Sequence, residues 1–340
     1  MAETSPYAYA KACGIIGKSF VGKRMSYLHG LHTLNDLDRL IFPNYYPNLP
    51  SRELLPDLQN RITMRAVSQI LSIVDSYSKP PKLIERMLRA YEYNDLKSCI
   101  HAIAAGKKEL PVICDIGRFG TINFKAFPDF NKMLKNTEFE FLLNDELQII
   151  SHNINIVLIE SKIDDLFYKG LAKSLDQLSN EDHWVMQRFL ADEISLHNCT
   201  WALRLRSYYH KGEDDIHKFL MDIRIHGKKK GSLTAEALQS LELPLDSRFQ
   251  WDNWKWEELL NPEEPAIHWT LDPRYFQNAA SNYLLKLASR YFRRNPMAVS
   301  AIFCFIKLVQ IEEDILTSIA EGLALGMDSS TVFSLLEVSS

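Results

Sequence analysis

Apolar residues recur at spacings of three and four along most of this 340-residue chain, and that spacing limits the folds open to it. Ile156, Ile159 and Ile163 show the pattern well, because residues so spaced lie on one face of an α-helix. Strict alternation of apolar and polar residues, which marks half-buried strands, is rare. Glycine and proline are also scarce, at 13 and 14 residues. The sequence therefore predicts an all-α protein.

Breaker residues divide this helical pattern into segments. Gly106, Gly212 and Gly326 each follow a periodic stretch, and Pro296 precedes the last long one. Helices are accordingly expected over 61–77, 81–108 (as one helix or a pair), 154–171, 182–212, 281–292 and 297–326. The least regular part, 228–275, is expected to hold short helices and loops. Its tryptophans, Trp251, Trp254 and Trp256, fit either a small satellite core or a stacking surface for a partner.

The segment "ACGIIGKS" at residues 12–19 resembles a phosphate-binding loop in its ending. Such a loop needs a buried strand before it and a helix after it. No strand-like run precedes residue 12, whereas Tyr9, Cys13, Ile16 and Phe20 have helical spacing. We therefore expect a helix here, and keep nucleotide binding through Lys18 as an alternative.

Composition narrows the class of protein. The net charge of −4 disfavours a general nucleic-acid binder. The longest apolar run, 298–306, ends at Lys307, well short of the ~20 residues that span a bilayer. Lys11 and Lys18 interrupt the apolar residues that a secretory signal would need. Five scattered cysteines indicate free, buried thiols in a reducing compartment, so we expect a cytoplasmic protein without a membrane span.

Candidate metal ligands and catalytic groups are sparse. His29 and His32 are three residues apart, which suits chelation on a helix, but no third ligand is evident. His197 and Cys199 are two apart and point to different helix faces. Carboxylate pairs such as Asp164–Asp165 fit solvated helix faces better than an acid–base couple. No catalytic, cofactor or metal site is predicted.

Three of the expected helices share a pattern. With Cys99, Cys199 and Ile315 in register, a polar residue precedes each: Ser98, Asn198 and Asp314. This indicates three repeats of about 110 residues, each ending in such a helix. The corresponding domains are 1–108, 109–226 and 227–340. In this arrangement each polar residue faces either a hydrogen-bond partner or a wetted hollow.

Four stretches together carry a family resemblance. They are "SPYAYAKACG" near the start, "YNDLKSCIHAI" (93–103), "FLADEISLHNCTWALRLRSYYHKG" (189–212) and "RNPMAVSAIFCFIKLVQIEEDILTSIAEGLALGM" (294–327). In order and spacing they resemble the C subunit of bacterial and archaeal V-type ATPases, which is the counterpart of the d subunit of the eukaryotic enzymes. Gly14 and Gly17 in the first helix, and the Trp-rich stretch 250–256, depart from the family pattern.

The resemblance implies three similar helical domains arranged as a funnel with pseudo-threefold symmetry. It implies a non-catalytic rotor subunit in the central stalk, peripheral on the cytoplasmic face of the membrane, between the central shaft subunits and the membrane proteolipid ring. Asn198, Arg204 and Arg206 match the middle motif and are interface candidates, as is the cluster of Arg290, Arg293 and Arg294. A cytoplasmic helical adaptor remains a second alternative.

Overall fold

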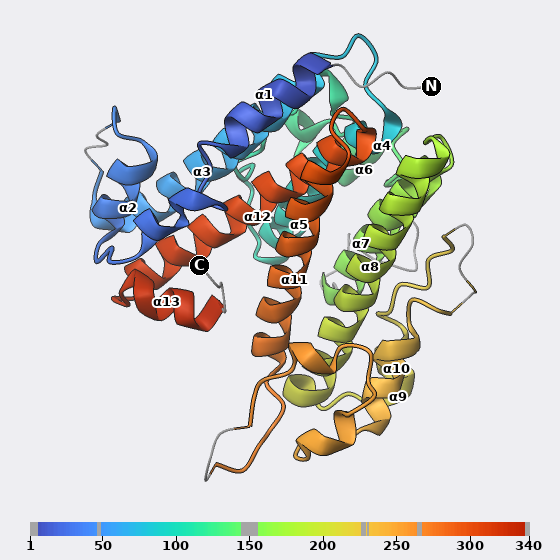
Figure 1. The fold of residues 1–340 in the computed structure, drawn as a ribbon. Coiled ribbons are helices and arrows are strands. Elements are labelled where there is room, and N and C mark those ends of the chain that lie inside the picture. The colour runs from blue at the N-terminus through green and yellow to red at the C-terminus, as the bar shows by residue number, and fades with distance from the viewer. Residues whose placement is uncertain are drawn as a thin grey trace. The chain divides into compact units, whose positions relative to one another are not determined.

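The computed structural model describes residues 6–45, 49–143, 156–225, 229, 231–263 and 267–336. Over these ranges the regular elements are α-helices and short 3-10 helices, without a strand, which confirms the all-α prediction (Figure 1). Among them, no helix is at once long and apolar enough to cross a bilayer.

Contacts divide the chain into two compact units. Unit 1 combines residues 1–80 with 239–340, and unit 2 comprises 81–238. Unit 1 is thus built from two segments far apart in sequence, which the helical periodicity did not indicate. The predicted division into 1–108, 109–226 and 227–340 stays a prediction, and its second boundary lies outside the described residues.

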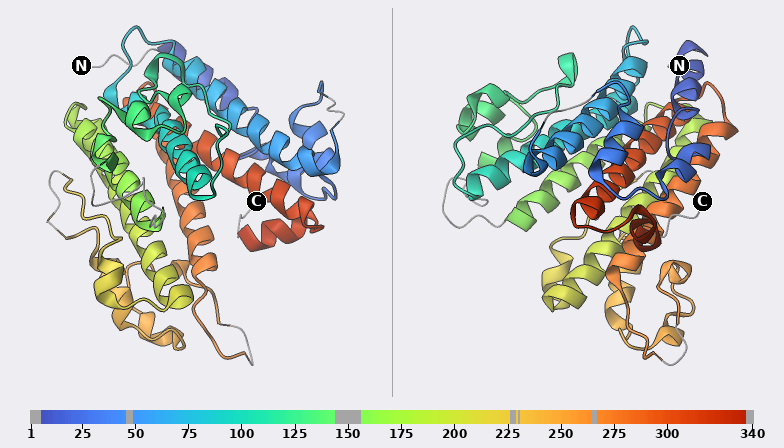
Figure 2. Two further views of the ribbon diagram at one scale, coloured as in Figure 1. Left: turned by 180° about the vertical axis from the view of Figure 1, so that it is seen from behind. Right: turned by 90° about the vertical axis from the view of Figure 1, so that its left-hand side faces the viewer.

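Helix α12 (Val299–Ala324) lies at the centre of unit 1. Its apolar residues are buried on several sides, including the predicted Ile302, Ile306 and Val309. Figure 2 shows it crossing helices from the start of the chain, in blue. The helices packed on it are α1 (Pro6–Ile16), α2 (Leu34–Ile41), α3 (Ser51–Val74), α11 (Pro273–Arg294) and α13 (Ser329–Leu336).

Small residues set how closely α12 is approached. A Cβ built on Gly322 would collide with Cγ2 of Val332 on α13, so glycine is what lets the two helices meet. On α1 the fully buried residues are Ala8 and Ala12, whereas Cys13 is exposed. The predicted face through Tyr9 and Cys13 is therefore wrong. A pattern of large apolar side chains overlooks a helix that packs through alanines.

The tryptophans of 228–275 form a satellite core in unit 1. Trp251, Trp254 and Trp256 are 0–5% exposed, and the first two rings meet edge to face at 5.0 Å. Trp251 Nε1 donates to the carbonyl of Pro244 at 2.8 Å. Buried rings with partners inside the chain offer no stacking surface, so that alternative is wrong. The described residues of this stretch form short helices and loops, as predicted.

Unit 2 is built mainly on a helix pair and a hairpin. The pair is α4 (Lys82–Leu88) and α5 (Ala90–Ala104), which breaks at Arg89 and ends before Gly106 at φ +70°. The hairpin is α7 (Ile156–Leu175) and α8 (Asn180–Tyr209), and α7 packs on both helices of the pair. The predicted 81–108 pair and the two predicted hairpin helices are confirmed within a few residues.

Shorter elements complete the fold. They are α6 (Phe130–Leu134) and α9 (Glu213–His217) in unit 2, α10 (Ala235–Glu242) at the unit boundary, and 3-10 helices at Lys23–Leu28, Gly117–Phe119, Phe124–Ala126, Glu140–Leu143, Arg248–Trp251 and Glu257–Leu259. Helix α8 ends at Tyr209, and the next residue, His210, adopts the left-handed conformation at φ 49°. The Lys211 N–H then donates to the Leu205 carbonyl, closing the helix before the predicted stop at Gly212.

Candidate interaction surfaces

The backbone around residues 12–19 has no donors free for a phosphate. Helix α1 ends at Ile16, and the N–H groups of Gly17, Lys18 and Ser19 donate to carbonyls one turn back, at 2.9–3.1 Å. The next N–H, of Phe20, donates to the Glu312 carboxylate at 2.7 Å. A phosphate loop needs these groups turned toward its ligand, and a buried carboxylate here would repel an anion. Nucleotide binding at Lys18 is therefore not favoured.

Two of the histidines singled out in the sequence have ring partners inside the chain. The His29 ring stacks on Phe333 with centroids 4.2 Å apart, and the His197 ring lies 5.9 Å from the Tyr168 ring and 6.4 Å from the Trp201 ring. Cys199 is fully buried, as predicted. Over the described ranges, His, Cys, Asp and Glu side chains do not gather in groups of three or more that could hold a metal ion.

Asn198 is fully buried in the middle of α8, and its side chain joins that helix to two later segments of the chain. Its Nδ2 donates to the carbonyls of Met221 and Leu233 at 3.0 and 2.9 Å, and its Oδ1 accepts from the Met221 N–H at 2.8 Å. Ser98 and Asp314, which the repeat register equates with Asn198, are exposed. The three residues thus differ in environment, and the pseudo-threefold register remains a prediction.

Arg204 and Arg206 lie in the last turns of α8 and are half-buried. The Arg204 guanidinium lies over the Trp201 ring, 5.9 Å from its centroid. Burial lowers the pKa of Arg206. Beyond them, Tyr208 and Tyr209 are exposed, so this helix end presents aromatic and basic side chains together. That composition is typical of the residues that contribute most to protein interfaces.

The arginines at the end of α11 are all exposed. Arg290, Arg293 and Arg294 make no ion pair with any residue that the structure describes. Directly after them Met297 is 47% exposed and is held at φ +69°, an uncommon backbone conformation for a residue with a side chain. We call these four residues the arginine patch. Three such cations beside an exposed methionine form a surface suited to an acidic partner.

Helix α1 borders the arginine patch. The Tyr9 hydroxyl donates to the Phe292 carbonyl at 3.4 Å, and the two rings lie 5.4 Å apart. Burial raises the pKa of Tyr9, and the positive charge of Arg293 opposes that rise. Two residues before it, Tyr7 is 63% exposed. The surface around the patch thus adds a tyrosine that the sequence did not single out.

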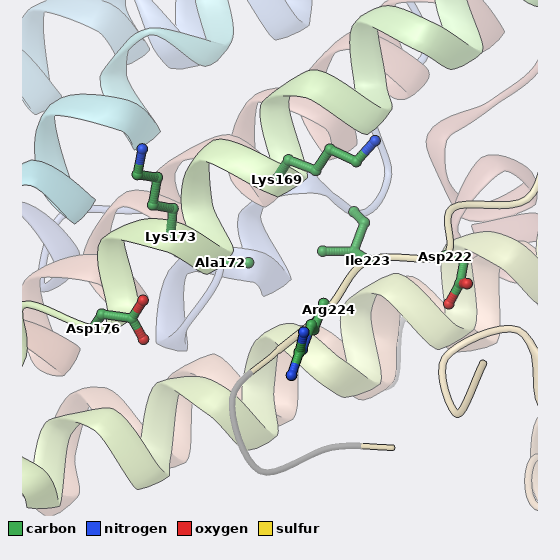
Figure 3. A pocket seen from close by; sticks show the side chains of 7 residues that line it. All are labelled: Lys169, Ala172, Lys173, Asp176, Asp222, Ile223 and Arg224. Carbon is green, nitrogen blue, oxygen red and sulfur yellow. The ribbon is translucent and has the colours of Figure 1, made fainter. Parts of the chain in front are cut away.

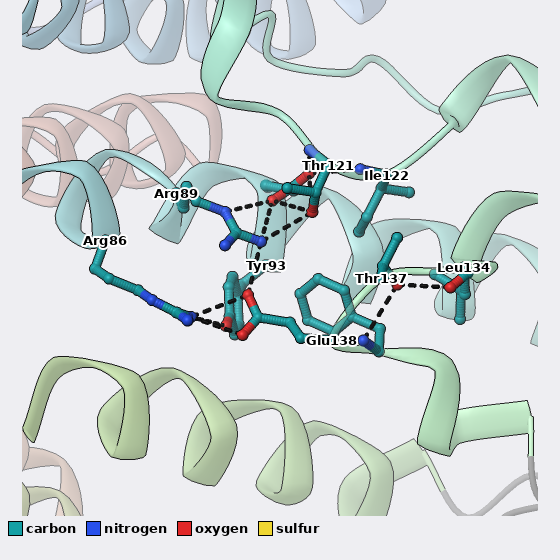
Figure 4. A network of polar contacts seen from close by, with 10 residues as sticks. Arg86, Arg89, Tyr93, Thr121, Ile122, Leu134, Thr137 and Glu138 are labelled. Carbon is teal, nitrogen blue, oxygen red and sulfur yellow. Dashed lines mark hydrogen bonds and ion pairs between the residues drawn. The ribbon is translucent and has the colours of Figure 1, made fainter. Parts of the chain in front are cut away.

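A buried polar network in unit 2 was also missed. The Arg89 guanidinium bridges the carboxylates of Glu92 and Glu138 at 2.8 and 2.7 Å (Figure 4). Glu92 also accepts from the N–H groups of Thr121 and Ile122. These contacts fasten the loop after α5 onto the helix pair. Arg89 and Glu92 are three residues apart, but Thr121, Ile122 and Glu138 lie about 30 to 50 residues from their partners, so no local spacing could reveal those contacts.

A cavity of about 440 Å³ lies between α7 and the segment 222–224 (Figure 3). It is lined by Lys169, Ala172, Lys173, Asp176, Asp222, Ile223 and Arg224. In Figure 3 Ile223 points toward α7, whereas Asp222 and Arg224 point to the opposite side of their segment. The side chains do not converge on one point, so the cavity lacks the arrangement of an enzyme site.

Comparison with known proteins gives one family match. Residues 42–333 match the family described as ATP synthase (C/AC39) subunit. An uncharacterized protein of Treponema pallidum is 23% identical over 320 residues, covering 94% of this chain and 92% of that protein. The C subunit of the A-type ATP synthase of Methanosphaera stadtmanae is 21% identical over 194 residues, which is 56% of this chain and 49% of that protein. The second relative is thus matched over about half its length.

Proposed function

Because the chain belongs to the ATP synthase (C/AC39) subunit family, we propose that it is the non-catalytic subunit that couples the central shaft of a V-type ATPase or ATP synthase to the membrane proteolipid ring. The family match over 42–333 carries this proposal. In this role the protein transmits torque and is peripheral on the cytoplasmic face of the membrane. Its partners are the shaft subunits and the ring, and the coupled process is ion transport.

The fold is consistent with a mechanical part. The described residues form helices packed on central α12 in unit 1 and on the α7–α8 hairpin in unit 2. The backbone N–H groups of 17–20 are occupied by carbonyls and by Glu312, which supports a subunit without a nucleotide of its own. A funnel of three domains around a pseudo-threefold axis remains part of the proposal.

The arginine patch is our first candidate for a partner contact. Arg290, Arg293 and Arg294 carry charge without an ion pair to any described residue, and Met297 adds exposed apolar surface. The end of α8, with Arg204 and Arg206 behind Tyr208 and Tyr209, is the second. Asn198 is not a candidate for a partner contact, because its side chain is buried and holds the backbone of Met221 in place.

Co-purification tests the assignment. The tagged chain is co-expressed with the shaft and proteolipid subunits of its own organism, and the complex is captured at low and at moderate salt. We expect the partners to be recovered with the chain, and ATP-driven ion pumping in vesicles to require it. Capture of the chain alone, together with pumping that continues when the chain is omitted, would overturn the proposal.

A charge-reversal variant tests the patch separately. Arg293→Glu with Arg294→Glu should reduce recovery of the complex, most visibly at low salt, where attraction between charges is least screened. The matched control is Arg274→Glu with Lys79→Glu, which changes the net charge equally at other exposed positions of unit 1. Equal recovery with both double variants removes the arginine patch from the interface and leaves the family assignment intact.

A further inference from the structure

The segment after α1 gathers positive charge without acidic residues around it in sequence. No aspartate or glutamate occurs from residue 4 to residue 35, whereas Lys18, Lys23 and Arg24 lie close together. Lys18 and Lys23 are exposed and Arg24 is half-buried, and none of the three makes an ion pair with a residue that the structure describes. We call residues 18–27 the basic loop.

The guanidinium of Arg24 holds the basic loop in a closed shape. Its Nη1 donates to the Lys18 carbonyl at 2.7 Å. The Phe20 and Tyr27 rings lie on it, with centroids at 4.8 and 5.8 Å. The backbone that carries the three cations is therefore ordered before any partner binds, and a partner has little of it left to immobilise.

Neighbouring carboxylates do not neutralise the basic loop. Glu312 hydrogen-bonds to the loop backbone, but its own charge is balanced by Arg65 at 3.3 Å. Asp36, the next acidic residue along the chain, accepts hydrogen bonds from Thr33 and lies in the field of Arg39. The positive charge of the loop thus stays available to a partner that carries negative charge.

The form of the loop favours a surface of many phosphates over a single bound phosphate or a protein. The N–H groups of 17–20 are taken by carbonyls of α1 and by Glu312, so one phosphate would meet side chains alone. Exposed lysines are depleted at protein interfaces. Tyr27 is 59% exposed, and tyrosine is enriched at the headgroup level of bilayers.

We propose that the basic loop binds the anionic headgroups of a phospholipid bilayer. Lys18, Lys23 and Arg24 contact the lipid phosphates, and the Tyr27 ring lies among the headgroups. The inference rests on the proposed function, which places the chain on the cytoplasmic face of the membrane, where the leaflet carries anionic lipids. The loop then adds a lipid contact to the contacts with the shaft and the ring.

Vesicle binding by the purified full chain tests the loop. The probe is vesicles of phosphatidylglycerol and phosphatidylcholine in equal parts, with pure phosphatidylcholine as the reference, and binding is measured by co-sedimentation at low salt. We expect binding to the anionic vesicles alone, weakening as salt is added. One basic residue near such a surface contributes about fivefold in affinity. Lys18→Glu with Lys23→Glu should therefore weaken binding about twentyfold or more.

The matched control is Lys79→Glu with Arg274→Glu, which changes the net charge equally at other exposed positions of unit 1 and should retain most of the binding. If the loop variant does not fold, as judged by circular dichroism, glutamine replaces glutamate in both double variants. Equal binding to the two kinds of vesicle, or an equal loss in both double variants, would overturn the proposal.

Competitors distinguish the lipid surface from other anions. Displacement of the chain from vesicles by millimolar inorganic phosphate would indicate a discrete phosphate site. Displacement by oligoglutamate at matched charge would indicate an acidic protein partner. Either result overturns the assignment to lipid. Co-purification with the shaft and ring subunits is read separately, so a chain that assembles but does not bind vesicles refutes this inference and leaves the proposed function intact.

Discussion

The carboxylate of Glu312 accepts a hydrogen bond from the backbone N–H of Phe20 at 2.7 Å, across 292 residues of sequence. The same oxygen lies 3.3 Å from Nη2 of Arg65 on α3. Glu312 is 3% exposed, so this bond lies inside the unit 1 core. One side chain on α12 thus fixes the turn after α1, directly beyond the segment 12–19 that resembles a phosphate-binding loop.

Removal of the Glu312 side chain should destabilise unit 1. Glu312→Ala leaves the Phe20 N–H buried without an acceptor, at a cost of about 1–3 kcal/mol of unfolding free energy. Glu312→Gln keeps an acceptor and should cost less. Denaturant unfolding followed by circular dichroism measures both, with the exposed Glu321→Ala as the surface control. An unchanged midpoint for Glu312→Ala would contradict the prediction.

The close approach of α12 and α13 should depend on Gly322. Gly322→Ala places a methyl group against Val332, and overpacking of this kind costs about 1–3 kcal/mol. Val332→Ala in the same chain removes the obstructing methyl and should recover part of the loss. Gly14→Ala is the control, since its Cβ meets nothing within 4 Å and should gain up to ~1 kcal/mol of helix propensity. If the free-energy changes of Gly322→Ala and Val332→Ala simply add in the double variant, the two residues are not in contact and the prediction is contradicted.

Asp95 should make unit 2 less stable as the pH rises toward neutral. Burial raises the pKa of this carboxyl to about 7, although its hydrogen bonds from Cys114 oppose the rise. The unfolded value is about 3.9, so the folded state holds a proton that the unfolded state has lost. The stability contribution is therefore full below about pH 4 and is lost between about pH 4 and 7.

Asp95→Asn should remove that dependence. The amide oxygen can still accept from the Cys114 N–H, and the side chain cannot ionise. We expect the variant to be more stable than the parent at pH 7.5 and to show a flatter stability profile over the same window. Asp214→Asn, at an exposed position of the same unit, controls for the loss of a carboxylate. If the stability of the parent and of Asp95→Asn changes with pH in the same way, the raised pKa of Asp95 is refuted.

Cys199 should tolerate an apolar replacement and reject a charged one. Its side chain is fully buried on α8, so Cys199→Asp forces a carboxylate into the core and should cost several kcal/mol. Cys199→Ala should be mild by comparison. Cys13 provides the matched control, because it is exposed and Cys13→Asp should barely change the melting temperature. Equal melting temperatures for Cys199→Asp and the parent would show that the side chain of residue 199 is exposed to solvent.

Local spacing located the long helices, although α3 and α11 begin ten and eight residues before the predicted starts at 61 and 281, and it failed where partners are distant. Ile302, Ile306 and Val309 identify the buried face of α12 because helical period alone fixes which residues share a face. Asn198 looked like an interface residue, yet it is held by Met221 and Leu233, 23 and 35 residues further on. Only the fold brings them together, and the same is true of the contacts from Arg89 to Glu138 and from Ile122 to Glu92, and of the cavity beside α7.

Unit 1 also imposes an order on synthesis. Its first helices, α1 to α3, leave the ribosome long before α11 and α12, because the whole of unit 2 is translated in between. Until residue 299 and those after it emerge, the apolar faces of α1 and α3 lack the helix that covers them. Contacts of such high sequence separation form slowly. The nascent N-terminal helices are consequently exposed to aggregation for most of translation, and a chaperone that shields them would raise the yield of folded protein.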